Sequence, residues 1–173
     1  MVPYVKHRIC LALGLMMLCN ASLVTAATSS LTDDEVNKEW LEAEVQLPAA
    51  PKAENLITFY QSGNQTFAID SQSVNLAGDG TVRYTLIATS NSGVKNISYE
   101  AIRCETYEKK LYAFGRPDGS WSRSRRNEWD RITQSGINKQ HYVLYTDYFC
   151  DGNTIAGKTP VLIDRLHNKR TLY

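Results

Sequence analysis

Between residues 56 and 115, short segments of alternating apolar and polar residues are separated by turn-forming residues. Segment 81–89 would place apolar side chains on one side of a strand and polar ones on the other, namely Val82, Tyr84 and Leu86 against Arg83 and Thr85. Alternation with a period of two predicts strands, and the turns at 62–64, 78–80 and 91–93 leave only short connections. We therefore expect a meandering antiparallel sheet, with strands at 56–60, 66–70, 81–89, 95–106 and 110–115.

A helix is predicted ahead of this sheet, over residues 32–47. Thr32 and Glu35 have the spacing of a capping box, in which each side chain caps a backbone amide at the start of a helix. Apolar residues then recur at helical spacing and form one stripe: Val36, Trp40, Ala43 and Leu47. Pro48 ends the pattern, and residues 48–51 predict a stiff extended connector.

Two further helices are predicted after the sheet. The first carries an apolar stripe of Ile137, His141, Leu144 and Tyr148. The second opens at Thr159-Pro160, because proline suits the first turn of a helix, and should run to about residue 168. The order of elements predicts an α+β fold, a meandering antiparallel sheet with the N-terminal and C-terminal helices packed on one side.

The first 26 residues have the layout of a secretory signal peptide. Basic residues at 6–8 precede an apolar run at 9–18, and small residues follow as far as Ala26. A membrane anchor needs about 20 apolar residues, and this run is shorter. Lipid attachment at Cys19 is disfavoured because the bulky Leu18 precedes it. We expect cleavage after Ala26, a periplasmic location, and no transmembrane segment in the mature protein.

The rest of the chain divides into an acidic arm at 27–51 and a single α+β domain at 52–173. Between Ala27 and Tyr60, seven acidic side chains stand against two lysines, whereas the remainder of the mature chain is net basic. The arm and the domain could pair internally. Alternatively, the arm could dock on another protein and leave a basic face for an anionic partner.

Removal of the leader leaves two cysteines, Cys104 and Cys150. An oxidising compartment favours a disulfide, and two cysteines allow one pairing. A redox pair usually has Cys-x-x-Cys spacing, and a closed zinc site needs four ligands. Neither pattern is present, so we expect a Cys104–Cys150 disulfide, no metal site and no cofactor.

The segment 115–131 concentrates arginine and tryptophan. Arginine binds carboxylate or phosphate at two points, and tryptophan stacks on sugars or guanidinium groups. The segment therefore predicts a surface for an anionic ligand, made by Arg116, Trp121, Arg123, Arg125, Arg126 and Trp129. Asp118, Glu128 and Asp130 neutralise much of this charge, so ion pairing within the protein is the competing interpretation. We expect no nucleic-acid partner, since an exported protein meets little nucleic acid.

Catalytic motifs are absent from the sequence. It contains no Gly-x-Ser-x-Gly elbow, His-Glu-x-x-His zinc motif or phosphate-binding loop. Glu100 could pair with Glu105 or Glu108, and His141 could act as a general base. However, a histidine on an apolar stripe is more often a hydrogen-bonded core residue.

An ordered set of short strings resembles the CNP-one-like family of exported Gram-negative bacterial proteins. The most specific are Val82-Arg83-Tyr84-Thr85-Leu86, Asn96-Ile97-Ser98-Tyr99-Glu100-Ala101-Ile102-Arg103-Cys104, Lys110-Leu111-Tyr112-Ala113-Phe114-Gly115-Arg116 and Tyr148-Phe149-Cys150. The resemblance spans about residues 40–166. It implies a periplasmic or envelope location and agrees with the disulfide, but it supplies no catalytic residue and no ligand.

These observations favour a non-enzymatic envelope protein, a binding or structural domain whose partner is an anionic envelope component or another envelope protein. The alternative is a hydrolytic enzyme that acts on cell-wall or other envelope material and uses scattered acids together with His141.

Overall fold

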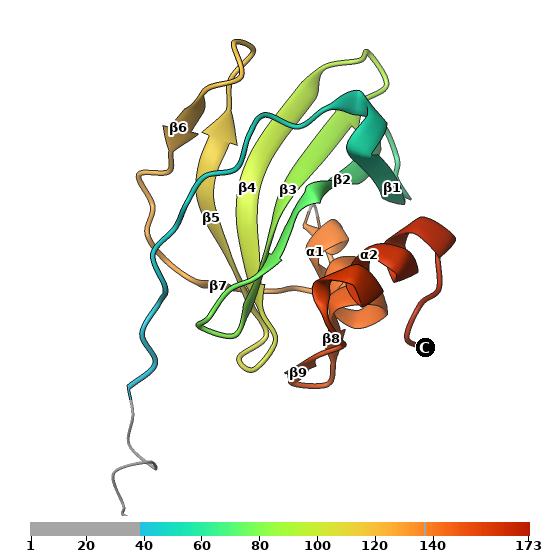
Figure 1. Cartoon of the computed structure of the whole chain (residues 1–173). Coiled ribbons are helices and arrows are strands. Elements are labelled where there is room, and N and C mark those ends of the chain that lie inside the picture. Colours follow the sequence, from blue (N-terminus) through green and yellow to red (C-terminus); the bar gives the residue numbers. More distant parts are fainter. Residues whose placement is uncertain (1–38, 137) are drawn as a thin grey trace, which may run out of the picture. The chain divides into compact units, whose positions relative to one another are not determined.

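The computed structural model describes residues 39–136 and 138–173, and residues 39–173 form one compact unit. A seven-stranded antiparallel sheet dominates it, in the order β1-β2-β3-β4-β5-β6, with β7 also paired to β5 (Figure 1). The strands are β1 Leu56–Ser62, β2 Gln65–Leu76, β3 Thr81–Ser90, β4 Lys95–Arg103, β5 Glu108–Gly115, β6 Trp121–Arg123 and β7 Asp130–Arg131. Each strand from β1 to β5 pairs with the next in the chain, so the predicted meander is confirmed.

The remaining elements are short. A 3-10 helix, η2 Ala53–Asn55, precedes β1, and a helical region follows the sheet. This region contains α1 Lys139–Val143, the π-helix η3 Leu144–Phe149, the small hairpin β8 Cys150–Asp151 and β9 Thr154–Ile155, and α2 Thr159–Asn168. The helix predicted from Thr159 to about residue 168 is confirmed, with proline in its first turn.

The strand β3 is buried on both of its faces, since every residue from Thr81 to Ile87 is buried. Its even-numbered side chains belong to the main hydrophobic core with the C-terminal helices, which contribute Leu144, Tyr148, Phe149, Leu162 and Leu166. A second, smaller core on the opposite face contains Tyr99, Ala101, Tyr112 and Ala113. Because a buried sheet face must be covered, the fold needs a cover on each side.

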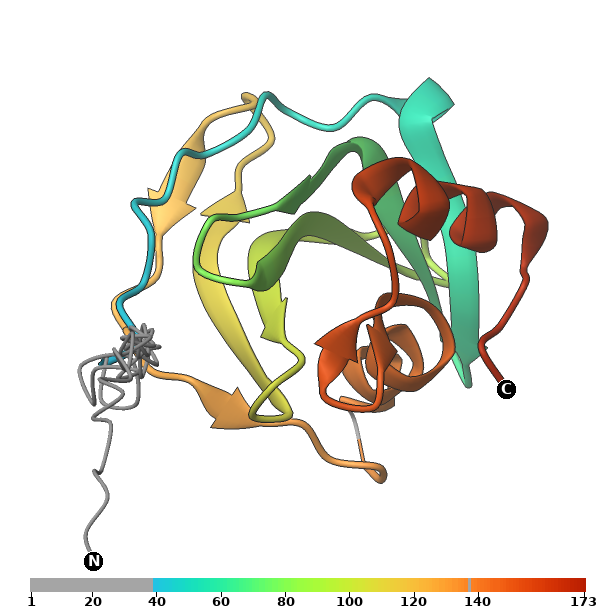
Figure 2. The ribbon, with the colours of Figure 1, turned by 60° about the horizontal axis from the view of Figure 1, so that its bottom comes forward.

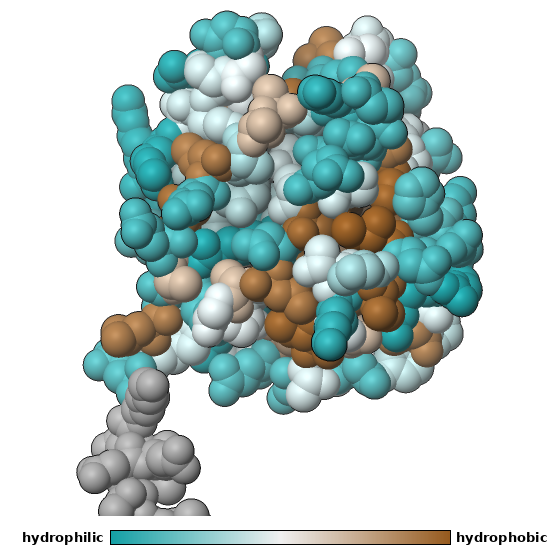
Figure 3. Space-filling view, in the orientation of Figure 1, coloured by the Kyte–Doolittle hydropathy of each residue, from teal (hydrophilic) through white to brown (hydrophobic). Residues whose placement is uncertain are grey.

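The helices cover one face. In Figure 2 the sheet curls around α1 and η3, while α2 packs beside them. Hydrophobic residues on the side shown in Figure 3 gather over these C-terminal helices, whereas hydrophilic residues dominate most of the surface around them. Among the described residues, no helix has the length and apolar character needed to cross a membrane.

The opposite face is covered by an extended segment, residues 39–51, which we call the strap. The predicted N-terminal helix is wrong for residues 39–47, which have no helical structure, and residues 32–38 of that prediction lie outside the described residues. The predicted packing of both sets of helices on one side is therefore also wrong. Val45 and Leu47 of the strap pack on the smaller core, opposite the C-terminal helices.

A buried ion pair explains why this part of the strap does not form a helix. Asp79 accepts a hydrogen bond from the backbone amide of Ala43 at 2.9 Å, and Arg83 donates to the carbonyl oxygens of Ala43 and Glu44 at 2.8 Å each. Asp79 and Arg83 are joined at 2.8 Å, with side chains 0% and 4% exposed. These contacts occupy backbone groups that a helix would use for its own hydrogen bonds.

Further side-chain contacts hold the strap along its length. Glu42 accepts hydrogen bonds from Lys110 at 2.5 Å and from Tyr112 at 2.7 Å. The indole of Trp40 donates to the carbonyl oxygen of Asp79 at 2.7 Å. The described part of the acidic arm therefore packs on the domain of the same molecule, and Glu42 forms an ion pair with it.

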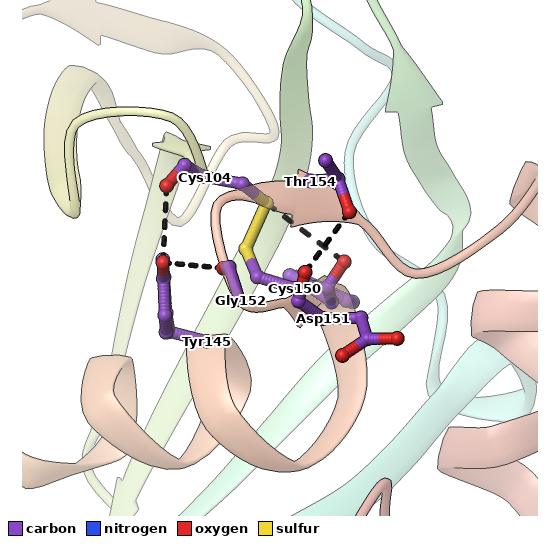
Figure 4. Close-up of a disulfide and its surroundings, with 7 residues drawn as sticks. Cys104, Tyr145, Cys150, Asp151, Gly152 and Thr154 are labelled. Carbon is purple, nitrogen blue, oxygen red and sulfur yellow. Dashed lines mark hydrogen bonds between the residues drawn. A yellow bond between two sulfur atoms is a disulfide. The ribbon is translucent and has the colours of Figure 1, made fainter.

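The predicted disulfide is present between Cys104, just after β4, and Cys150, the first residue of β8 (Figure 4). The two Cα atoms are 5.6 Å apart, and the cysteines are 46 residues apart in sequence. The hydroxyl of Tyr145 lies 3.0 Å from the carbonyl oxygen of Cys104 and 2.6 Å from that of Gly152, and can donate to either. The bridge thus ties the helical region to the sheet it covers.

We expect removal of the disulfide to lower the free energy of unfolding. In the chain-entropy model, a loop of this length stabilises by about 4 kcal/mol. The double variant Cys104→Ser/Cys150→Ser, compared with the oxidised protein by urea denaturation, should lose a stability of this order. Titration of unfolded, unreduced protein that comprises residues 27–173 should find no free thiol. A free-thiol count of two would contradict the bridge.

We expect Asp79→Asn to loosen the strap, because it leaves the buried Arg83 guanidinium without its carboxylate. Breaking a buried ion pair costs about 3–5 kcal/mol, and urea denaturation measures the loss. Glu54→Gln is the matched control, since Glu54 is exposed. Equal stabilities for the two variants would show that the strap does not depend on this pair.

Candidate functional site

The candidate site is a cavity of about 390 Å³ on the helical side of the sheet, between strands β2–β5 and the start of α1. Its apolar lining consists of Phe67, Leu86, Ala88, Ile97, Leu111 and Phe114. Its polar lining consists of Lys95, Asn96, Ser98, Glu100, Lys109, Asn138, Gln140 and His141. Ligand-binding cavities commonly combine such a volume with apolar walls and a few convergent polar groups.

The register of three strands places Glu100 among its partners. Glu100 on β4 lies opposite Tyr84 on β3 and Leu111 on β5. The pairing of β4 with β5 shifts at this point, because Tyr99 pairs with Ala113 while Glu100 pairs with Leu111. Such a bulge re-aims neighbouring side chains, and here both Leu111 and the later Phe114 line the cavity.

The Glu100 carboxylate accepts hydrogen bonds from three side chains. The hydroxyl of Ser98 donates to Oε1 at 2.6 Å, and that of Tyr84 donates to Oε2 at 3.3 Å. The Nε2 atom of His141 lies 2.6 Å from the same Oε2 and acts as a donor when it carries a proton. A carboxylate offers only acceptors, so these contacts satisfy it inside the protein.

These contacts decide the charge of Glu100. Burial by itself would raise the pKa of Glu100, but the charge and hydrogen bond of His141, the Ser98 hydroxyl and the charge of Lys109 lower it below its ordinary value. For Tyr84, burial and the neighbouring Glu100 both raise the pKa of the phenol. Glu100 is therefore a carboxylate at neutral pH, and Tyr84 keeps its proton for donation.

His141 on α1 contacts the sheet through the side chain of Glu100 on β4. Its side chain is buried, and its Nε2 atom faces Glu100. Its other ring nitrogen, Nδ1, is also buried and has no hydrogen-bond partner among the described residues. An unsatisfied buried polar atom costs about 1–3 kcal/mol, so a hydrogen-bond partner at this nitrogen would stabilise the protein.

Two other cavities of similar volume in the described part of the chain lack this pair of groups. One, of about 380 Å³, lies at the end of the strap and is lined by small and polar residues together with the charged Lys52, Glu54 and Asp70, but by no histidine. The other, of about 400 Å³, shares Phe67 and Gln140 with the candidate site. Its lining contains no carboxylate or histidine. The candidate site therefore differs from both in its histidine–carboxylate pair and in its larger apolar lining.

The structure separates the residues of the sequence-predicted Arg/Trp surface. The indole of Trp121 donates to the carbonyl oxygen of Pro48 at 2.7 Å, and Trp129 packs edge-on against Trp40 at 5.7 Å between ring centroids. Both tryptophans thus hold the strap. The four arginines are exposed, namely Arg116, Arg123, Arg125 and Arg126.

One of these arginines is already paired. Arg126 lies 3.0 Å from Glu128 and 2.7 Å from Asp130. The competing interpretation of ion pairing within the protein therefore holds for Arg126, while Trp121 and Trp129 contact the strap. An anionic-ligand surface on the other arginines stays a prediction.

The sequence singled out Glu100 and His141 but not their pairing with each other. Glu105, considered as a partner of Glu100, instead forms an exposed ion pair with Arg103 at 2.8 Å. Sequence reasoning also missed Lys109 and Phe114 as cavity residues. Alternation would have placed Lys109 on the Glu100 side of the sheet, but the bulge that brings Phe114 to that side has no sequence signal that we recognise.

A family model, described as the CNP1-like family, matches residues 35–167. The match covers most of the chain, and the chain belongs to this family, as the ordered strings in its sequence predicted. Neither a search of curated proteins nor a search of solved structures found a match.

We expect Glu100→Gln to destabilise the protein in a pH-dependent way. Because the pKa of Glu100 is lower in the folded than in the unfolded state, its carboxylate stabilises the fold above its ordinary value of 4.5. This contribution is lost as the pH falls through the folded-state pKa. Urea denaturation from pH 7 to pH 3 should show a large gap between wild type and variant that narrows below pH 4.5.

The control for this experiment is Glu105→Gln, because the Glu105 side chain is exposed. Its stability should stay close to that of the wild type throughout the range. A gap for Glu100→Gln that is the same at every pH would show that the carboxylate charge does not stabilise the fold.

Proposed function

We propose that this protein is an exported envelope domain that binds a small ligand, without catalysing a reaction, in the cavity beside Glu100 and His141. Export is supported by the signal-peptide layout of residues 1–26 and by the Cys104–Cys150 disulfide, because such bridges persist in oxidising compartments. Family membership adds the expectation of a periplasmic location that the resemblance implies.

The observation that carries the binding proposal is the composition of the cavity. Apolar side chains from β2, β3, β4 and β5 line it, and polar groups from β4, β5 and α1 converge on the same space. The buried Glu100 network holds several of these groups in fixed positions before any ligand arrives. Preorganised polar groups reduce the cost of ordering the site on binding.

The arrangement of the network favours binding over hydrolysis. In a catalytic triad, a nucleophilic hydroxyl or thiol is hydrogen-bonded to the histidine. Here Ser98 donates to Glu100 instead, and no serine or cysteine bonds to His141 within the described residues. Glu100 is already bound by three donors, so the geometry gives it a structural role.

The exposed arginines could form a second binding surface outside the cavity. Arg123 and Arg125 are exposed, and neither forms an ion pair with another described residue. An envelope component with negative charge would find these guanidinium groups accessible. The cavity remains the better-supported site because it has defined walls.

We expect ligand binding to be abolished by a side chain that fills the cavity. A library of small organic compounds can be screened against isotope-labelled mature protein by two-dimensional NMR, with hits identified by shifts of amides in β4, β5 and α1. In Ala88→Tyr the new ring should occupy the cavity and remove these shifts, while a partly exposed strand position tolerates an aromatic residue.

The matched control is Thr58→Tyr, since Thr58 is an exposed strand residue on β1 that lines none of the three large cavities. This variant should bind the same compounds as the wild type. The absence of any compound that shifts the cavity amides, or hits that survive in Ala88→Tyr, would refute the proposed function.

A further inference from the structure

We infer that the cavity binds a small amphipathic anion, with its acidic group at Lys109 and its apolar part along the wall that ends at Phe114. This inference rests on the proposed function, because it names the ligand class of the same cavity. It follows from the charges that line the cavity, from the apolar side chains beside them, and from the Nδ1 atom of His141, which has no hydrogen-bond partner among the described residues.

The charges of the cavity leave an excess of positive groups. Glu100 contributes the negative charge of the lining, and its two oxygens are already bound by Ser98, Tyr84 and His141. Lys95 and Lys109 also line the cavity, and neither is joined to a carboxylate in an ion pair within the described part of the chain. An acidic group would supply the missing counter-charge.

Lys109 is better placed than Lys95 to receive that group. It is partly buried and near enough to Glu100 for its charge to lower the pKa of the carboxyl, whereas Lys95 is exposed. A lysine charge with restricted access to water interacts more strongly with an anion than an exposed one. Lys109 should therefore determine the preference for a negative headgroup.

The apolar wall sets the second requirement for the ligand. Phe67, Leu86 and Leu111 form its buried or half-buried part. Phe114 lies at the rim with 51% of its surface exposed, and few other large apolar side chains of the described residues are so exposed. An apolar chain or ring bound along this wall would remove Phe114 from water, which is favourable. A simple inorganic anion would leave the wall uncovered.

His141 gives independent support for a bound group. Its ring lines the cavity, and its buried Nδ1 atom has no partner among the described residues. When the imidazole is protonated beside the Glu100 carboxylate, Nδ1 carries a hydrogen and can donate it. An acidic group bound at Lys109 would offer acceptor oxygens on the same side of the sheet.

Octanoate is the probe, compared with 1-octanol, octyltrimethylammonium and acetate. The first two comparisons change the headgroup on the same chain, and acetate removes the chain. Calorimetry and NMR titration of the mature protein should show octanoate binding about tenfold more tightly than octanol, as expected for a charge-assisted contact. Octyltrimethylammonium and acetate should bind more weakly than octanoate.

Two lysine variants test the site itself. Lys109→Gln should reduce the affinity for octanoate to that for octanol, whereas Lys158→Gln, at the exposed start of α2, should leave it unchanged. Phe114→Ala should weaken octanoate and octanol alike. All three variants should unfold near the wild-type urea concentration, which separates loss of binding from loss of fold.

The inference would be overturned if octanoate bound no better than octanol, or if Lys109→Gln bound octanoate as the wild type does. It would also be overturned if octanoate shifted no cavity amide while neutral or cationic compounds from the screen did. In that case the cavity would still bind ligands, and the proposed function would stand. Only a cavity that binds nothing would remove both.

Discussion

The burial of β3 on both faces is the constraint on which the rest of the fold depends. A central strand with seven consecutive buried residues cannot be stable in a sheet that faces water on one side. The C-terminal helices cover one face, and the strap covers the other. Each cover is fixed at one point by strong contacts, the disulfide for the helices and the Asp79–Arg83 pair for the strap.

The same constraint positions the cavity. The helices are short and cover only part of their face, so the ends of β3, β4 and β5 beyond α1 remain open. His141 lies at this boundary and joins the helical cover to the sheet through Glu100. A buried charge in such a place requires several donors to hold it, and those donors also organise the polar side of the cavity.

The sheet could be predicted well because alternation and turns are local signals. Strands at residues 81–90 and 95–103 follow directly from side chains that alternate between faces. The conformation of the N-terminal segment could not be predicted in the same way. Its apolar residues Trp40, Ala43 and Leu47 suit a helix, and they also suit an extended segment that is held by contacts with the rest of the protein. The buried groups of Asp79 and Arg83, 36 to 40 residues away, favoured the extended form. Helix propensity is a weak preference that tertiary contacts routinely override.

Sequence alone determined the meander, the C-terminal helix and the cysteine pairing, because each rests on periodicity, on short connections or on a count. Only the tertiary structure decided that Glu100 contacts His141, which lies 41 residues later in the chain. It also decided that Trp121 and Trp129 contact the strap. The same holds for the common cavity that Lys109 and Phe114 line. The reason is physical. Such contacts depend on strand register, a bulge and the position of the helices, and these are fixed by packing between distant parts of the chain.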